Sequence, residues 1–207
     1  MARFDITLLT PDRYKTTRWS GGSTTQLLIC PPEAQYADRD FLWRISSAVV
    51  EDEDSTFTPL PDYLRFISTL EGSIVLQHDG GEPIPLSPFQ VHAFDGGAET
   101  ISKGRCRDFN LMLRKGKTDG LLKAVSLSAG DTLSFRAAED SEELLLYCAE
   151  GSCFAELDGQ TFGLQKNEAA VLRRVSDDPR TEAPAAVITF TAPGGSRLMV
   201  AQMQKCG

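Results

Sequence analysis

Short apolar segments, each closed by glycine, proline or Asp-Gly, run through the whole chain and leave no room for long helices. About fifteen such segments occur, and their richness in Val, Ile, Leu, Phe and Thr is typical of β-strands joined by tight turns. Clear examples are residues 41–50, 64–70, 107–113 and 187–191. No stretch keeps the 3.6-residue period of a helix, although residues 118–124 could form one helical turn. The pattern predicts an all-β protein.

One supersecondary unit occurs twice. Glu71-Gly72-Ser73 recurs 79 residues later as Glu150-Gly151-Ser152, and each copy is followed by an apolar strand and a turn that contains Gly81 or Gly159. Without this repeat, 207 residues would fit one domain or two equally well. With it, we predict two β-barrels in tandem, residues 1–116 and 117–207. Closing each sheet into a barrel would also remove its exposed edges.

The charge balance excludes several classes of partner. Lys and Arg number 21 against 29 Asp and Glu, so the net charge is −8, whereas nucleic-acid binding depends on clustered basic residues. Asp5 and Pro11 interrupt the N-terminal stretch where a signal peptide needs an apolar core. No apolar run approaches the roughly 20 residues that span a bilayer. We expect a cytoplasmic protein with no nucleic-acid and no membrane partner.

A series of motifs then points to a known family. In chain order they are W-S-G-G-S-T-T at 19–25, F-L-W-R-I-S at 41–46, F-T-P-L-P at 57–61, L-E-G at 70–72, F-D-G at 94–96 and R-D-F-N-L-M at 107–112. Over roughly residues 3–116 the chain resembles the HutD/Ves family. The resemblance implies tandem cupin-type jelly-roll barrels (a bicupin), an association with bacterial histidine utilisation and a small ligand bound in the first barrel. It implies no firmly attached enzymatic activity, and for residues 117–207 it implies the fold alone.

Two departures from the family pattern leave the identity of the ligand open. Gln26 occupies a position where a charged residue is frequent in the family, and Gly97 follows F-D-G where many relatives carry a second acid. The ligand of this chain therefore need not be that of the better-known members.

The histidines argue against a metal site. Metal-dependent cupins hold their ion with about three His and one Glu, including a closely spaced pair on one strand, and zinc sites in general need several such ligands. This chain has two histidines, His78 and His92, which lack that spacing. We therefore expect no metal and no cofactor, and we expect each histidine to lie at the surface or in a hairpin.

Strand alternation groups the polar residues that could bind a ligand. Side chains alternate with period two along a strand, so Arg44 and Ser46 share one face, as do Asp108 and Asn110. Asp and Asn are poor strand formers, and their presence side by side on one face needs a reason. A solvated outer face is one explanation. An inward polar face inside an apolar barrel is the other, and the family resemblance favours it, because such barrels can hold one small ligand.

Further candidates lie on neighbouring segments. An arginine can grip a carboxylate through two parallel hydrogen bonds, so Arg65 would bind an anion, unless it forms a salt bridge with Asp108 instead. The glycines and hydroxyls that follow Trp19 suit a ligand-facing loop, although a tight turn with Trp19 in the core would explain them equally. The predicted ligand-binding residues are Trp19, Gly22, Thr25, Arg44, Ser46, Phe57, Arg65, Asp108 and Asn110, and no catalytic residue is predicted.

Three functions remain open from the sequence. The first is a metal-free protein that senses or buffers a small anionic metabolite of the histidine pathway, such as urocanate or formylglutamate. The second is a metal-independent enzyme that acts on a small carboxylate or sugar with Asp108 as general base. The third is an interaction scaffold whose barrels pair with another chain, which includes a homodimer. The first explains a polar cluster without catalytic histidines.

Overall fold

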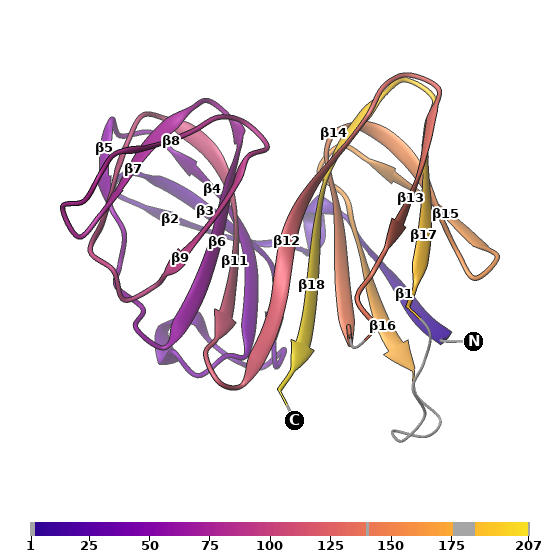
Figure 1. The fold of residues 1–207 in the computed structure, drawn as a ribbon, viewed down its shortest axis with the longest axis horizontal. Coiled ribbons are helices and arrows are strands. Elements are labelled where there is room, and N and C mark those ends of the chain that lie inside the picture. Colours follow the sequence, from indigo (N-terminus) through magenta and orange to yellow (C-terminus); the bar gives the residue numbers. More distant parts are fainter. Residues whose placement is uncertain (1–2, 140, 176–184, 207) are drawn as a thin grey trace. The chain divides into compact units, whose positions relative to one another are not determined.

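The computed structural model describes residues 3–139, 141–175 and 185–206, and its regular structure is almost entirely β (Figure 1). Helical structure within these residues is limited to the 3-10 turns η1 (Pro11–Arg13) and η2 (Tyr36–Asp38). The all-β prediction is confirmed, and residues 118–124 lie in a strand rather than a helical turn. The chain divides into two compact units. One is built on Tyr14–Asp119, and the other on Gly120–Lys205 together with the N-terminal strand.

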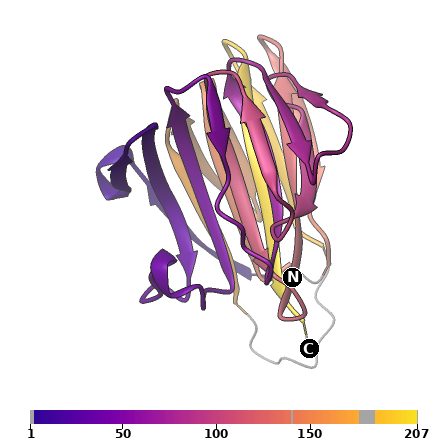
Figure 2. The same ribbon diagram turned by 90° about the vertical axis from the view of Figure 1, so that its left-hand side faces the viewer.

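The first unit, here the N-terminal barrel, has two antiparallel sheets. Its strands are β2 (Lys15–Trp19), β3 (Gly22–Cys30), β4 (Trp43–Val50), β5 (Asp54–Thr56), β6 (Tyr63–Glu71), β7 (Ile74–His78), β8 (Ile84–Leu86), β9 (Val91–Asp95), β10 (Thr100–Lys103) and β11 (Cys106–Arg114). The six-stranded sheet has the order β2-β3-β4-β11-β6-β9, and the four-stranded sheet has the order β5-β10-β7-β8. Figure 2 shows these strands from the side, coloured indigo to magenta.

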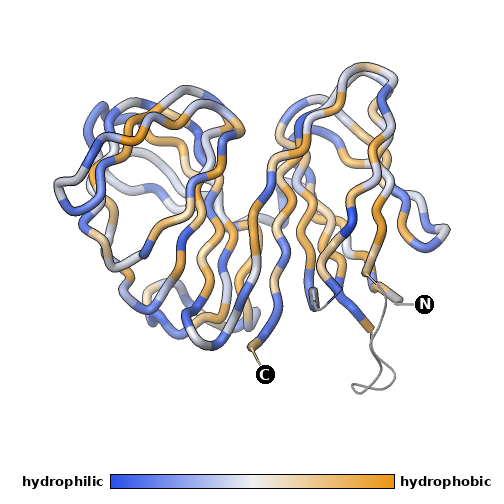
Figure 3. The backbone as a smooth tube through the Cα atoms, viewed as in Figure 1, coloured by the Kyte–Doolittle hydropathy of each residue, from blue (hydrophilic) through white to orange (hydrophobic). Residues whose placement is uncertain are grey.

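The second unit, here the C-terminal barrel, is one eight-stranded sheet. Its strands are β1 (Arg3–Leu9), β12 (Thr118–Leu127), β13 (Asp131–Arg136), β14 (Glu143–Leu157), β15 (Gln160–Gln165), β16 (Ala169–Val175), β17 (Val187–Ala192) and β18 (Ser196–Lys205). Hydrophobic residues recur along these strands, and the turn between β14 and β15 is mainly hydrophilic (Figure 3). Fully buried apolar side chains such as Leu144, Leu146, Ile188 and Phe190 fill the interior.

The division between the units differs from the predicted one at the N-terminus. We assigned residues 1–116 to the first barrel, but β1 pairs along its whole length with β16 of the C-terminal barrel, from Arg3 opposite Val175 to Leu9 opposite Ala169. The motif pattern contained no sign of this pairing, because β1 lies before the first motif of the series.

The glycine of the repeated E-G-S unit has the same structural role in both barrels. Gly72 and Gly151 have φ values of +77° and +70°, a region that suits glycine. A Cβ at Gly72 would lie 2.4 Å from the carbonyl oxygen of Arg105, and one at Gly151 would lie 2.2 Å from that of Gly195. Each glycine therefore lets the strand bend against a neighbouring backbone. In the second copy the strand continues through the bend, so the residues on both sides of Gly151 belong to the single strand β14.

Candidate ligand-binding site

The register of the six-stranded sheet brings the predicted polar residues onto one face. Arg44 on β4 and Arg65 on β6 lie on either side of Met112, which belongs to the intervening strand β11. One step along, Ser46 lies opposite Asn110. Directly opposed residues of antiparallel strands point to the same side of the sheet. The pairing therefore places two arginines and two hydrogen-bonding side chains in adjacent rows. Alternation alone predicted the shared face of Arg44 and Ser46.

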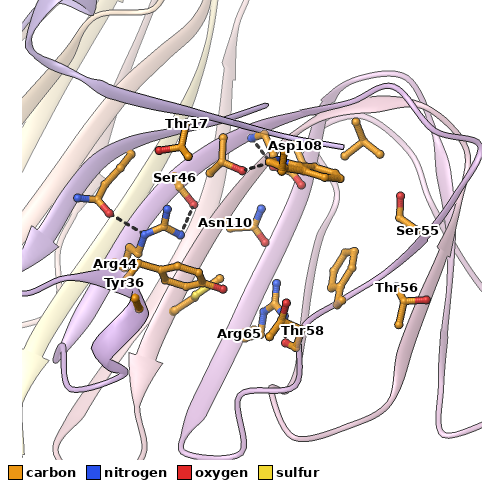
Figure 4. Close-up of a pocket in the computed structure, with 18 of the residues that line it drawn as sticks. Thr17, Tyr36, Arg44, Ser46, Ser55, Thr56, Thr58, Arg65, Asp108 and Asn110 are labelled. Carbon is orange, nitrogen blue, oxygen red and sulfur yellow. Dashed lines mark hydrogen bonds between the residues drawn. The ribbon is translucent and has the colours of Figure 1, made fainter. Parts of the chain in front are cut away.

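These rows form part of the wall of a cavity of about 760 Å³ in the N-terminal barrel (Figure 4). A cavity of this size suits a small metabolite. Seven of the nine predicted residues line it, namely Trp19, Arg44, Ser46, Phe57, Arg65, Asp108 and Asn110. The expectation of an inward polar face, rather than a solvated outer one, therefore describes β4 and β11 correctly.

Gly22 and Thr25 do not line the cavity, and their placement in a ligand-facing loop needs correction. The hydroxyl of Thr25 lies 2.9 Å from that of Thr16, because its strand position has the opposite parity to Thr24 and Gln26, which do line the cavity. Gly22 is buried in the sheet with a φ of +151°. A Cβ there would lie 1.9 Å from the carbonyl oxygen of a β4 residue, so this glycine serves strand packing.

Arg44 is held by neutral partners. It is only 6% exposed. Its Nε donates to the side-chain oxygen of Gln26 at 2.8 Å and its Nη1 donates to Ser46 Oγ at 3.0 Å. The ring of Tyr36 lies 4.4 Å from the guanidinium carbon. Burial lowers the pKa of Arg44 to about 10, so the side chain is still a cation at neutral pH.

Arg65 is held by fewer and longer hydrogen bonds than Arg44. It is 7% exposed, and it donates one long hydrogen bond of 3.5 Å to the carbonyl oxygen of Thr58. Its guanidinium carbon lies 4.8 Å from the ring centre of Phe57 and 5.1 Å from that of Phe94. Its Nε is buried and has no hydrogen-bond partner among the described residues, and burial lowers its pKa.

The salt bridge between Arg65 and Asp108, the alternative left open by the sequence, does not form between these two described residues. Asp108 instead accepts a hydrogen bond of 2.7 Å from the backbone N–H of Ala48. Burial raises the pKa of Asp108 to about 6, although the hydrogen bonds from Ala48 and Asn110 and the charges of the arginines lower it. The carboxyl group of Asp108 therefore gains or loses its proton at a pH close to 6.

Aromatic side chains and exposed groups complete the wall. Trp19 is 43% exposed and its indole N–H donates to Thr24 at 3.2 Å, so it is a cavity wall and not a core residue. Lys15, Asp52 and Asp54 also line the cavity and are exposed to solvent. The charged groups at the buried sheet face are thus mainly cationic, whereas the exposed ones have both signs.

Among the lining residues outside the predicted set, Gln26 and Tyr36 contact Arg44. Gln26 shares a strand face with Thr24 and could have been found by alternation from that position. Tyr36 comes from the turn η2, which has no periodic pattern to mark it. Both contact Arg44, so they define how its guanidinium lies in the cavity.

No group of three or more His, Cys, Asp and Glu side chains within the described residues is arranged to share a metal ion. The same residues include no helix with the length and apolar character needed to cross a membrane.

Solved structures with the same fold cover nearly the whole chain. A conserved protein of unknown function from Pseudomonas aeruginosa PAO1 is 24% identical, with a TM-score of 0.80 over 97% of this chain and 99% of that one. HutD from Pseudomonas fluorescens SBW25 is 23% identical, with a TM-score of 0.74 over 98% and 100%. A bacterial pirin from Escherichia coli, solved with nickel(II), is 12% identical, with a TM-score of 0.66 over 96% and 98%. The predicted cupin-type fold is confirmed.

Sequence comparison narrows the relationship from a shared fold to one family. An uncharacterised 21.2 kDa protein in the hutC 3′ region of Pseudomonas putida is 33% identical over 111 residues, which are 52% of this chain and 57% of that protein. The match thus spans little more than half the length of this curated relative. The family model HutD matches residues 11–189, which include most of both barrels. The chain belongs to the HutD family.

Proposed function

We propose that the N-terminal barrel is a metal-free binding site for a small anionic metabolite, and that the protein senses or buffers this metabolite. One observation carries the proposal. Arg44 and Arg65 are both more than nine-tenths buried in the wall of one cavity, and no carboxylate among the described residues forms an ion pair with either of them.

The energetic argument is that a buried cation is costly unless an anion compensates it. Gln26 and Ser46 orient the Arg44 guanidinium without neutralising it. A guanidinium has five N–H donors in a planar fork, so both arginines keep donors for a ligand. A carboxylate or similar anion would supply the missing charge and accept those hydrogen bonds. Neutral partners such as Gln26 and Ser46 therefore suit a preorganised anion site, because they fix the guanidinium and leave its charge for the ligand.

A link to histidine utilisation rests on relatives. The curated relative is named for its position in the hutC 3′ region, and one solved neighbour is named HutD. Urocanate and formylglutamate are anionic metabolites of this pathway, and both are small enough for a cavity of about 760 Å³. We take them as the first ligands to test.

Titration calorimetry of the wild type, Arg44→Met and Arg65→Met with urocanate, formylglutamate and a neutral control tests the proposal. Each substitution should lower anion affinity by about 1.5–3 kcal/mol, the scale of a hydrogen bond to a charged group. Arg105→Met is the matched control, because its exposed charge pairs with Glu53 outside the cavity and its loss should leave affinity unchanged. Equal affinities in all four proteins would refute the site.

A second function is favoured by Asp108. A carboxyl group with a pKa of about 6 that lines the cavity has the acidity of a general base. The alternative is therefore a metal-independent enzyme acting on a small carboxylate or sugar. Incubating each bound ligand with the protein and following its NMR spectrum distinguishes the two. Turnover that Asp108→Asn abolishes supports the enzyme, and unchanged ligand supports the binding protein.

A further inference from the structure

The two histidines of the chain form a hydrogen bond that joins the two sheets of the N-terminal barrel. His78 lies at the end of β7 in the four-stranded sheet, and His92 lies on β9 in the six-stranded sheet. Their Nε2 atoms are 3.0 Å apart, and both side chains are half-buried. We expected each histidine at the surface or in a hairpin, and His78 does end a hairpin strand, but the contact between the two histidines was not predicted.

Neighbouring groups determine where the protons lie in this pair. The hydroxyl of Thr100 donates to the carbonyl oxygen of Ala98 at 3.2 Å, so its oxygen accepts from His78 Nδ1 at 2.8 Å. His78 then carries its proton on Nδ1, and its bare Nε2 accepts from His92 Nε2. The Nδ1 atom of His92 is left as the basic nitrogen of the pair.

The geometry limits the pair to one additional proton. A proton on His92 Nδ1 leaves the bond between the two Nε2 atoms intact, and the charged ring then donates to a neutral one. A second proton would have to enter at His78 Nε2, which faces the N–H of His92 at 3.0 Å. Two N–H groups cannot point at each other across that distance, so the second protonation would break the bond between the sheets.

The histidine pair lies next to the proposed anion site, and the ring of Phe94 contacts both. The ring of Phe94 packs on His78 with centres 4.7 Å apart, and the same ring lies 5.1 Å from the guanidinium carbon of Arg65. Arg65 and Phe94 are directly opposed residues of β6 and β9. The cation that lines the cavity and the histidine pair are thus separated by one aromatic ring.

We propose that the His78–His92 pair is a one-proton acceptor linked to anion binding at Arg65, so that ligand binding raises the fraction of barrels that carry this proton. The inference rests on the proposed function, because it needs an anion at Arg65. A bound anion cancels the positive field of that guanidinium at the pair, and by linkage a protonated pair binds the anion more tightly. The effect is about fourfold in affinity for a unit charge roughly 10 Å away at an effective dielectric constant of about 40.

The charged groups around the pair agree with this linkage. Burial is the main cause that lowers the pKa of His78, the charge of Arg65 lowers it further, and Asp79 raises it. Burial and the neighbouring His78 lower the pKa of His92. Arg65 is therefore the cation whose neutralisation by a ligand would ease protonation of the pair.

Ring NMR signals test the proposal directly, since the chain has two histidines and the tag-free protein gives two imidazole spin systems. In the wild type, saturating urocanate or formylglutamate should raise the pKa at which the pair takes its first proton. In the ligand-free protein, Arg65→Met should raise that pKa more than Arg44→Met, because only Arg65 packs on Phe94. His92→Gln keeps a donor for His78 and should remove the roughly fourfold pH effect on affinity that the pair contributes.

The outcomes separate this inference from the proposed function. If calorimetry shows no anion binding at all, the proposed function fails, and the anion linkage fails with it. If anions bind through the arginines but both histidine signals keep their titration curves, only the linkage is refuted. Two independent histidine titrations in the ligand-free protein would refute the shared proton. Asp108 titrates in the same range, but its protonation does not appear as a histidine titration.

Discussion

Replacing Arg65 by methionine should leave the protein as stable as the wild type, or make it more stable, while it weakens anion binding. A residue retained for the fold behaves in the opposite way. Methionine has a similar length and flexibility, so it can fill the space beside Phe57 and Phe94 without a charge. The prediction therefore separates a functional arginine from a structural one by the sign of the change in stability.

The magnitude follows from the contacts of Arg65. Its hydrogen bond to Thr58, at 3.5 Å, is longer than the usual 2.7–3.2 Å and contributes little. Contacts with two aromatic rings contribute about 0.5–2 kcal/mol each. Against them, a buried donor without a partner, the Nε of Arg65, costs about 1–3 kcal/mol, and desolvation of the charge adds to that cost. We expect the free energy of unfolding to stay within about 1 kcal/mol of the wild type or to rise.

Urea denaturation followed by far-UV circular dichroism, which reports on the strands of both barrels, measures this free energy, and a matched variant calibrates it. Arg173 pairs with the buried carboxylate of Glu143 in the C-terminal barrel, so Arg173→Met removes the cation beside a buried anion and should cost about 1–3 kcal/mol. The reasoning is refuted if Arg65→Met loses as much stability as Arg173→Met and keeps wild-type affinity for anions.

Three further predictions concern Asp108 and Tyr36 in the cavity wall and Gly22 in the sheet behind it. Burial raises the pKa of Asp108 from 3.8 to about 6, so its contribution to stability is complete below pH 3.8 and lost as the pH rises through 6. Asp108→Asn should therefore match the wild type in urea denaturation at pH 4 and exceed it by up to about 3 kcal/mol at pH 7. Gly22→Ala should cost more than about 3 kcal/mol in thermal unfolding, since its Cβ would lie 1.9 Å from a carbonyl oxygen, whereas Gly80→Ala, with nothing within 4 Å, should cost about 1–2 kcal/mol. Tyr36→Leu should weaken anion binding about two- to tenfold by removing the ring beside Arg44, and Tyr36→Phe, which keeps the ring, should not. A fluorescence titration that finds the two Tyr36 variants equal would contradict this role.

The part of the site that lies on regular strands could be predicted from the sequence. Alternation is a property of the extended backbone, so it grouped Arg44 with Ser46 and Asp108 with Asn110 on shared faces before any packing was known. The family resemblance then favoured the inward orientation of such a polar face. Alternation was not applied to β3, where the hydroxyl-rich motif alone suggested Thr25. The register shows that its neighbours Thr24 and Gln26 face the cavity instead.

The remaining features depend on contacts between distant segments. Tyr36 reaches Arg44 from a turn, and the contact between His78 and His92 requires two different sheets to face each other. No local pattern encodes either distance. The same holds for β1, whose partner β16 lies more than 160 residues further along the chain, beyond the reach of any periodicity.

The pairing of β1 with β16 has a consequence for how the polypeptide acquires its structure during synthesis. The first strand leaves the ribosome early, but its partner, Ala169–Val175, follows only after the whole N-terminal barrel has been made. The N-terminal barrel is therefore an insertion in the sequence of the C-terminal one. Because its own sequence is contiguous, it can fold before β1 has a partner. A gene fragment that encodes residues 117–207 alone would lack β1 and leave one edge of β16 exposed. We expect such a fragment to aggregate, because an unpaired strand edge is a template for intermolecular pairing.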